Sequence, residues 1–339
     1  MRQRLWIGTY PEAGQGTPTG MGEGIWSLEL DLDTGALAGA RQVVVTAAPS
    51  FIVASGALLY AVNEEVDGRL TVLRSTGDGL EIAGTARTAG AHPCHLVFSP
   101  ELRSAVVANY SSGSVSLIRV DSAGLPQADQ PAQVIAFGGS GPRADRQEAA
   151  HAHYLLPTPA RSHLLACDLG TDSLHRLRLE PASRSLAYEG VAATLPPGSG
   201  PRHAVFAGSL LHVLGELDGR LHSLAWDEAT TLARPVAAIP LNPDAAGDPS
   251  HLSHSGRLLA AASRGDDRLC LFALGPDGLP RRLRDFQLPG AWPRHHAMLG
   301  EWLVVALQHS GEVVCLDRRG NTRGAAAIPS PACICPAAG

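Results

Sequence analysis

Residues 92–120 read HPCHLVFSPELRSAVVANYSSGSVSLIRV and hold three short strand-like segments in a row. The first, PCHL, starts at a proline, and the second, VVANY at 106–110, is an apolar run that ends in polar residues. The third, SVSLIRV at 114–120, has the alternating pattern of a β-strand. We therefore looked for the same order of segments in the rest of the chain, because a repeated unit decides the fold.

Both of the first two segments recur seven times. The proline-led segment, once led by Ala, occurs as PSFI at 49, PCHL at 93, AHYL at 152, PRHA at 201, PSHL at 249, PRHH at 293 and PACI at 331. The apolar run occurs as LWIGT at 5–9, YAVNE at 60–64, VVANY at 106–110, LACDL at 165–169, HVLGE at 212–216, AAASR at 260–264 and VVALQ at 304–308. In six copies, the fourth residue of the apolar run lies 14 or 16 positions after the leading residue of the segment before it.

This periodicity predicts an all-β fold. A third strand follows each run, and a looser fourth strand follows it, as in DTGALAGARQVVV at 33–45. Four antiparallel strands every 40–50 residues are typical of a β-propeller, so we expect seven four-stranded blades. The first apolar run lacks a leading segment, and PACI at the C-terminus has nothing after it. We expect these terminal strands to close the ring in one blade, with residues 1–339 forming a single propeller domain.

Composition limits the possible partners. The 339 residues carry a formal charge of −5, and all 27 basic residues are arginines. A mildly acidic chain is unsuited to coating nucleic acid or a membrane surface, and no apolar stretch is long enough for a membrane helix. Six scattered cysteines, without a CxxC pair, favour buried reduced thiols and a cytoplasmic protein. We expect a monomer or a weak homodimer.

The candidate site follows from the repeat. The first strand of each blade lines the central channel, so the residues after the leading positions form a ring at one rim: Ser50, Cys94, His153, Arg202, Ser250, Arg294 and Ala332. The loops that follow the second strands open on the same rim and add Glu64, Tyr110, Asp168 or Leu169, Glu216, Arg264 and Gln308, with Thr9 and Tyr10 from the closing blade. Buried arginines need an anionic partner, which is either an internal carboxylate or a ligand.

Other histidines and two unusual loops carry weaker signals for function. His95, His203, His251 and His295 each follow a ring residue, and we expect them to pack between blades. Residues 128–150, rich in Gly, Pro and charge, predict a long loop, and a loop of that length is often functional. The Gly-rich segment 11–24 lacks the spacing of a phosphate-binding loop. Glu148, His151 and His153 have ligand side chains but match no common zinc spacing, so we expect no metal.

Several motifs give the chain a family resemblance. IGTY at 7–10, HPCHLVFSP at 92–100, ANYSSGSVSL at 108–117, DRQEAAHAH at 145–153, PPGSGPRHAVF at 196–206, GEL at 215–217, SRGDD at 263–267 and WPR at 292–294 resemble the seven-bladed propeller lactonases. That family includes the cycloisomerase-type 6-phosphogluconolactonases and is related to carboxymuconate-lactonising propellers. The resemblance runs through all seven blades and implies hydrolysis of 6-phosphogluconolactone to 6-phosphogluconate in the pentose phosphate pathway.

The resemblance also implies site residues. The positions that match the relatives' site are His153, Arg202, Glu216 and Arg294, with Arg264 in addition; from the rim we add His151, Glu64 and Tyr110 as substrate-binding residues. Lactone hydrolysis needs a base for water, a site for the oxyanion and an acid for the ring alkoxide. His153 or Glu216 would serve as base and Arg202 as the electrophilic group, with no cofactor and, since GxSxG is absent, no acyl-enzyme.

Two alternatives stay open at this point. The chain could be a lactonase for another sugar lactone or a muconate-type lactonising cycloisomerase on the same scaffold. It could also be a non-enzymatic propeller that binds a small ligand or a protein, because a fold does not fix a function. At least two arginines that converge on one point of the rim would favour the phosphorylated lactone over the other substrates, and arginines neutralised by internal carboxylates would favour the binding protein.

Overall fold

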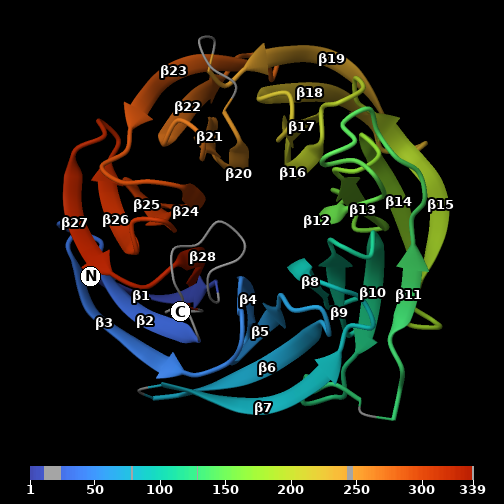
Figure 1. Ribbon diagram of the computed structural model, residues 1–339, viewed down its shortest axis with the longest axis horizontal. Helices are drawn as coiled ribbons and strands as arrows, with labels where there is room; N and C mark the ends of the chain where they lie inside the picture. Colours follow the sequence, from blue (N-terminus) through green and yellow to red (C-terminus); the bar gives the residue numbers. More distant parts are fainter. Residues whose placement is uncertain (11–23, 78, 128, 243–246, 338–339) are drawn as a thin grey trace.

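Seven four-stranded antiparallel sheets follow one another around a ring in the computed structural model, which describes residues 1–10, 24–77, 79–127, 129–242 and 247–337 (Figure 1). The predicted all-β, seven-bladed propeller is therefore confirmed. We number the blades in chain order from the first complete one, so that blade 1 begins at residue 51 and blade 7 contains both ends of the chain.

Each blade runs from the central channel outward in the order first, second, third and fourth strand. The first strands of blades 1–7 are β4 (Phe51–Ser55), β8 (Pro93–Ser99), β12 (Ala152–Pro157), β16 (Pro201–Ala207), β20 (Pro249–Ser255), β24 (Pro293–Leu299) and β28 (Pro331–Pro336). The second strands are β5 (Leu58–Asn63), β9 (Ser104–Asn109), β13 (His163–Asp168), β17 (Leu210–Gly215), β21 (Leu258–Ser263), β25 (Trp302–Leu307) and β1 (Arg2–Thr9).

The two outer positions complete the blades. The third strands are β6 (Arg69–Thr76), β10 (Ser114–Arg119), β14 (Ser173–Glu180), β18 (Arg220–Asp227), β22 (Arg268–Leu274), β26 (Glu312–Asp317) and β2 (Ile25–Asp31). The fourth strands are β7 (Gly79–Arg87), β11 (Gln133–Ala136), β15 (Ser185–Thr194), β19 (Leu232–Pro240), β23 (Pro280–Gln287), β27 (Thr322–Ala327) and β3 (Leu37–Val44).

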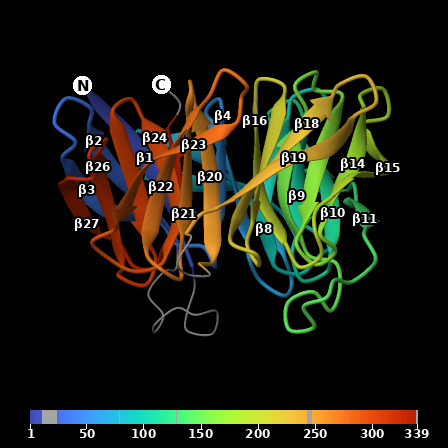
Figure 2. The same ribbon diagram turned by 90° about the horizontal axis from the view of Figure 1, so that it is seen from above.

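The chain ends close the ring as expected. Strand β28 supplies the first strand of blade 7 and pairs with β1, with Ile7 opposite Ile334 and Gly8 opposite Cys333. Joining the two ends in one sheet removes the open edges that an unclosed ring would expose. Both termini lie on one face of the ring (Figure 2), and β1 carries the chain from there through the ring to Tyr10.

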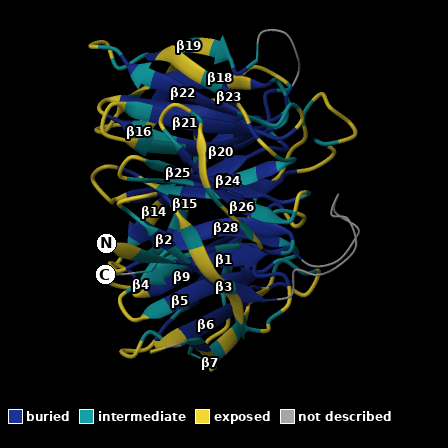
Figure 3. Cartoon of the chain, turned by 90° about the vertical axis from the view of Figure 1, so that its left-hand side faces the viewer, coloured by how far each residue is buried: buried dark blue, intermediate teal, exposed yellow. Residues whose placement is uncertain are grey.

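Apolar packing between blades holds the ring together. The second strands are almost entirely buried, as in β13, where all six residues are buried, whereas the fourth strands are largely exposed (Figure 3). Each of the seven blade-to-blade contacts has its own cluster of buried apolar side chains. Burial of one Leu, Ile or Val contributes about 1.5–3 kcal/mol, so these clusters account for the repeated apolar runs in the sequence.

A β-bulge recurs at the start of the first strands. In β16, Pro201 pairs with Gly215 and His203 with Leu214, which leaves Arg202 as an extra residue without a partner in the ladder. The same shift occurs in β8, β12, β20 and β24, and β28 shows it against β1. A bulge redirects side chains locally. It explains how one strand presents two consecutive residues to the channel.

In six blades, the second of these two residues is aromatic. Together these six side chains form a circuit that we call the floor ring: Phe51, His95, Tyr154, His203, His251 and His295. Neighbouring ring centroids around this circuit are 3.8–5.8 Å apart. Burial lowers the pKa of His95 to about 3 and holds the pKa values of the other three histidines well below 6.5. As we expected, these histidines pack between blades: each ring lies against rings from other blades on both sides, so the contacts run around the channel.

Two other predictions need comment. The expected loop over 128–150 is wrong in part, because β11 lies within it and covers β10 as the outer strand of blade 2. The alternating exposure of its four residues is that of a strand with one face on the blade.

Most of the Gly-rich segment, residues 11–23, lies outside the described residues. The described residues contain no helix of the length and apolar character that crossing a membrane requires.

Candidate active site

A cavity of about 350 Å³ lies above the floor ring, on the face opposite the termini. Its lining residues are Tyr10, Glu64, Cys94, Tyr110, Arg146, His153, Arg202, Glu216, Arg264, Trp292 and Arg294. Nine of them come from the starts of first strands and from the loops that follow second strands, whereas Arg146 and Trp292 come from loops that lead into first strands; together they represent all seven blades. The volume lies within the usual range for small-molecule sites. Seven of the eight predicted site residues line this one cavity, and His151 does not.

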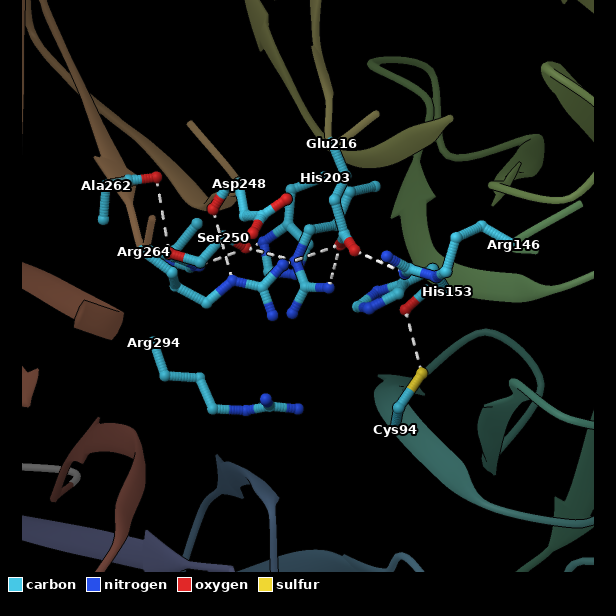
Figure 4. A network of polar contacts seen from close by, with 12 residues as sticks. Cys94, Arg146, His153, His203, Glu216, Asp248, Ser250, Ala262, Arg264 and Arg294 are labelled. Carbon is cyan, nitrogen blue, oxygen red and sulfur yellow. Dashed lines mark hydrogen bonds and ion pairs between the residues drawn. The ribbon is translucent and has the colours of Figure 1, made fainter. Parts of the chain in front are cut away.

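Glu216 is the common partner of three arginines, which come from the long loop and from blades 4 and 5 (Figure 4). Its Oε1 accepts a hydrogen bond from Arg146 Nη2 at 2.5 Å, and its Oε2 accepts one from Arg202 Nη1 and forms an ion pair with Arg264 Nη2 at 3.1 Å. Burial alone would raise the pKa of Glu216, but the three guanidinium groups hold it well below its usual range. The carboxylate therefore stays ionised and has both oxygens engaged.

The arginines are held in place by more than Glu216. Arg202 Nε donates to the carbonyl oxygen of Ser250 at 2.7 Å, and Arg264 Nε donates to that of Asp248 at 3.2 Å. The guanidinium of Arg264 also lies 5.2 Å from the ring centroid of Trp292. Burial lowers the pKa of Arg264 to about 10, an effect that Glu216 partly offsets and that neighbouring arginines strengthen. Burial is thus the main cause of the lowered pKa of Arg264.

His153 borders the cavity beside this cluster (Figure 4). The side chain is buried, and its Nδ1 has no hydrogen-bond partner among the described residues. Burial, followed by the charge of Arg202, holds its pKa well below 6.5, so the imidazole is neutral at neutral pH. The ring of Tyr110 packs edge-on against it, with the centroids 5.7 Å apart. His153 is therefore a neutral, unpartnered proton acceptor next to fixed cations.

A second polar group lies across the cavity from Glu216 and combines three blades. The Tyr10 hydroxyl donates to Glu64 Oε1 and accepts from Arg294 Nη2 at 2.6 Å, while the Arg294 guanidinium lies 4.1 Å from the Tyr10 ring centroid. Arg294 Nη1 also contacts Gln308 Oε1 at 3.4 Å. Burial raises the pKa of Tyr10 well above 10, so its hydroxyl keeps its proton. Glu64 Oε2 is buried and has no partner among the described residues.

His151 lies behind Tyr110 and does not reach the cavity. Its ring stacks on that of Tyr110 with the centroids 4.5 Å apart, and its Nε2 lies 3.1 Å from Glu148 Oε1. A residue two positions from His153 on a regular strand would share its side, but the bulge in β12 breaks that alternation. In the described part of the chain, no group of three His, Cys, Asp or Glu side chains is arranged to hold a metal ion.

The cavity includes residues that sequence reasoning did not select. Arg146 comes from the long loop between blades 2 and 3, whose length and charge were the available signal. The predicted rim includes Tyr10 and Cys94 without a role, and it does not include Trp292. Four arginines and two glutamates leave the cavity with a formal charge of +2 when His153 is neutral. The internal carboxylates thus only partly neutralise the arginines, which favours an anionic ligand over a purely structural ion-pair network.

Comparison with known proteins agrees with this geometry. A family model described as "Lactonase, 7-bladed beta-propeller" matches residues 4–334. The chain is 27% identical to a 6-phosphogluconolactonase of Bacillus subtilis over 352 residues, which cover 97% of each protein. It is 27% identical to a 6-phosphogluconolactonase of Formosa agariphila, over 79% of this chain and 80% of that one. The solved structure of the periplasmic gluconolactonase of Pseudomonas aeruginosa is 28% identical, with a TM-score of 0.88 over 100% and 99% of the chains.

Proposed function

Because the chain belongs to the seven-bladed β-propeller lactonase family, we propose that it is a lactone hydrolase that opens 6-phosphogluconolactone to 6-phosphogluconate, a step of the pentose phosphate pathway. The observation that carries the proposal is the formal charge of +2 in a cavity of small-molecule size. A phosphate group is close to a dianion at neutral pH and would balance that charge. The chemistry needs no cofactor.

The phosphate is assigned to Arg264 and Arg294. Figure 4 shows both guanidinium groups pointing into the open space that Glu216 and His153 border. Arg294 forms no ion pair with a carboxylate among the described residues, and Arg264 shares Glu216 with two other arginines. Arginine suits phosphate because its planar fork can donate two parallel hydrogen bonds. These two side chains therefore offer donors that the protein itself does not fully use.

The reaction is assigned to His153 and Arg202. His153 takes a proton from water, and the resulting hydroxide adds to the lactone carbonyl carbon. The Arg202 guanidinium stabilises the oxyanion of the tetrahedral intermediate. Collapse of the intermediate breaks the ring C–O bond, and the imidazolium returns its proton to the ring alkoxide. Glu216, with both oxygens on arginines and a lowered pKa, is better suited to holding those arginines than to acting as base.

A panel of lactones with and without the terminal phosphate tests the substrate. We expect kcat/KM for 6-phosphogluconolactone to exceed that for glucono-δ-lactone by about 100-fold, since a hydrogen bond to a charged group contributes about 1.5–3 kcal/mol. Rates are measured with the lactone generated in situ and corrected for spontaneous opening. Inorganic phosphate should inhibit competitively. Equal rates on the two lactones, without inhibition by phosphate, would contradict the assignment.

A gluconolactonase is the second candidate. It is supported by the similarity to the periplasmic gluconolactonase of Pseudomonas aeruginosa, which is as similar to this chain as the Bacillus subtilis protein. The same panel separates the two, because a gluconolactonase would prefer the unphosphorylated substrate.

We infer a cytoplasmic location for the protein, as expected for six buried free cysteines. Cell fractionation tests that inference.

A further inference from the structure

Glu64 is the feature of the cavity that the proposed reaction does not use. Its Oε1 accepts from the Tyr10 hydroxyl, whereas its Oε2 is buried without a hydrogen-bond partner among the described residues. A buried carboxylate oxygen without a donor is costly, and such atoms are rare in folded proteins. Because Glu64 lines the cavity, a ligand placed there is in a position to supply the missing donor.

The neighbours of Glu64 fix how its carboxylate is presented. The Tyr10 hydroxyl donates a hydrogen bond to Glu64 and accepts one from Arg294, so a chain of two hydrogen bonds joins blades 1, 6 and 7. Tyr10 cannot ionise near neutral pH, because burial raises its pKa well above 10. The carboxylate is thus held through Oε1, and Oε2 is the oxygen left for a ligand.

The two carboxylates of the cavity are therefore not equivalent. Both oxygens of Glu216 are engaged by arginines, and three arginines share them. Glu64 contacts no arginine directly among the described residues and keeps one acceptor free. A second anionic group of a ligand would meet like charge at Glu64, whereas a hydroxyl group would meet an acceptor.

We propose that Glu64 is a specificity-determining residue whose Oε2 accepts a hydrogen bond from a ring hydroxyl of the substrate. This inference rests on the proposed lactonase function and narrows it. The cavity then has a cationic side for one anionic group and an acceptor side for hydroxyls. Such a site selects a polyhydroxylated lactone with a single anionic end, and it disfavours lactones of the muconate type with carboxylates at both ends.

The test compares two neutral lactones, glucono-δ-lactone, which carries hydroxyls, and δ-valerolactone, which carries none. In the Glu64→Gln variant, the amide oxygen still accepts from Tyr10, and an NH₂ donor replaces Oε2. We expect kcat/KM for glucono-δ-lactone to fall about 5- to 150-fold, mainly through KM, as an unsatisfied hydrogen bond of about 1–3 kcal/mol implies. The value for δ-valerolactone should stay within about threefold.

The control is Glu65→Gln, which removes the same charge at the next residue but outside the cavity, and should leave both substrates unchanged. Inhibition by a dicarboxylate such as adipate provides a second measurement, in which the variant is expected to gain and not to lose binding. It should inhibit the Glu64→Gln variant more strongly than the wild type, a gain that a damaged fold cannot produce.

Two outcomes would overturn the inference. An equal loss of kcat on both lactones would place Glu64 in the chemical step, and unchanged kinetics on both would leave it no role in selection. Failure of the proposed function is recognised separately, because the wild-type protein would then hydrolyse neither sugar lactone nor 6-phosphogluconolactone above the spontaneous rate, and the inference would fall with it.

Discussion

Replacing His153 with alanine is expected to lower kcat for lactone hydrolysis by about 100- to 10,000-fold, the range typical of losing a general base. His153 is the neutral group of the cavity whose Nδ1 has no other partner, so no neighbouring side chain is already placed to replace it. The measurement is the initial rate above spontaneous opening. Added imidazole should restore part of the rate by entering the vacated space.

The pH dependence gives this prediction a second readout. Burial and Arg202 hold the pKa of His153 well below 6.5, so the imidazole stays unprotonated as the pH falls through about 6.5. The acid limb of kcat/KM, which reports the free enzyme, should therefore lie well below pH 6.5. A surface variant, His254→Ala, serves as the control. A His153→Ala rate within threefold of the wild-type rate would remove His153 from the mechanism.

Replacing Glu216 with glutamine is expected to have the largest effect on stability. Three guanidinium groups share this buried carboxylate, and removing one partner of a buried ion pair typically costs about 3–5 kcal/mol. The arginines would also lose their positions, so kcat/KM should fall by at least about 100-fold. Chemical denaturation gives the free energy of unfolding, and the lactone assay gives the activity.

The stability loss in Glu216→Gln could arise from the missing negative charge or from a general packing defect, and anion binding distinguishes the two causes. If the three arginines repel one another once Glu216 is neutral, then phosphate in the buffer should raise the denaturation midpoint of Glu216→Gln more than that of the wild type. Glu148→Gln is the matched control, because it removes an exposed carboxylate from the long loop that carries Arg146. Wild-type stability in Glu216→Gln, with or without phosphate, would contradict the central role of this carboxylate.

The repeat in the sequence predicted most of the architecture because each blade buries the same strand in the same way. The apolar runs became the buried second strands, and PACI at the C-terminus paired with the first apolar run as expected. What the sequence did not reveal was the bulge. A one-residue shift in the ladder leaves no mark in an alternating pattern, yet it separates Arg202, which lines the cavity, from His203, which lies in the floor ring.

Two other parts of the site depend on contacts that the local sequence does not encode. Arg146 reaches Glu216 from 70 positions away in the sequence, so its role depends on how the long loop lies over the cavity. His151 has the right residue type close to His153, but the ring of Tyr110 lies against it. Residue types placed by the repeat were predictable, whereas residues delivered by an irregular loop were not.

The most direct test of the account is a crystal structure of the protein with 6-phosphogluconate bound. We predict the sugar acid in the cavity above the floor ring, with its phosphate on Arg264 and Arg294 and its new carboxylate at Arg202 beside His153. Sugar phosphate bound on another surface of the ring, or in the cavity with its phosphate away from these arginines, would contradict the account.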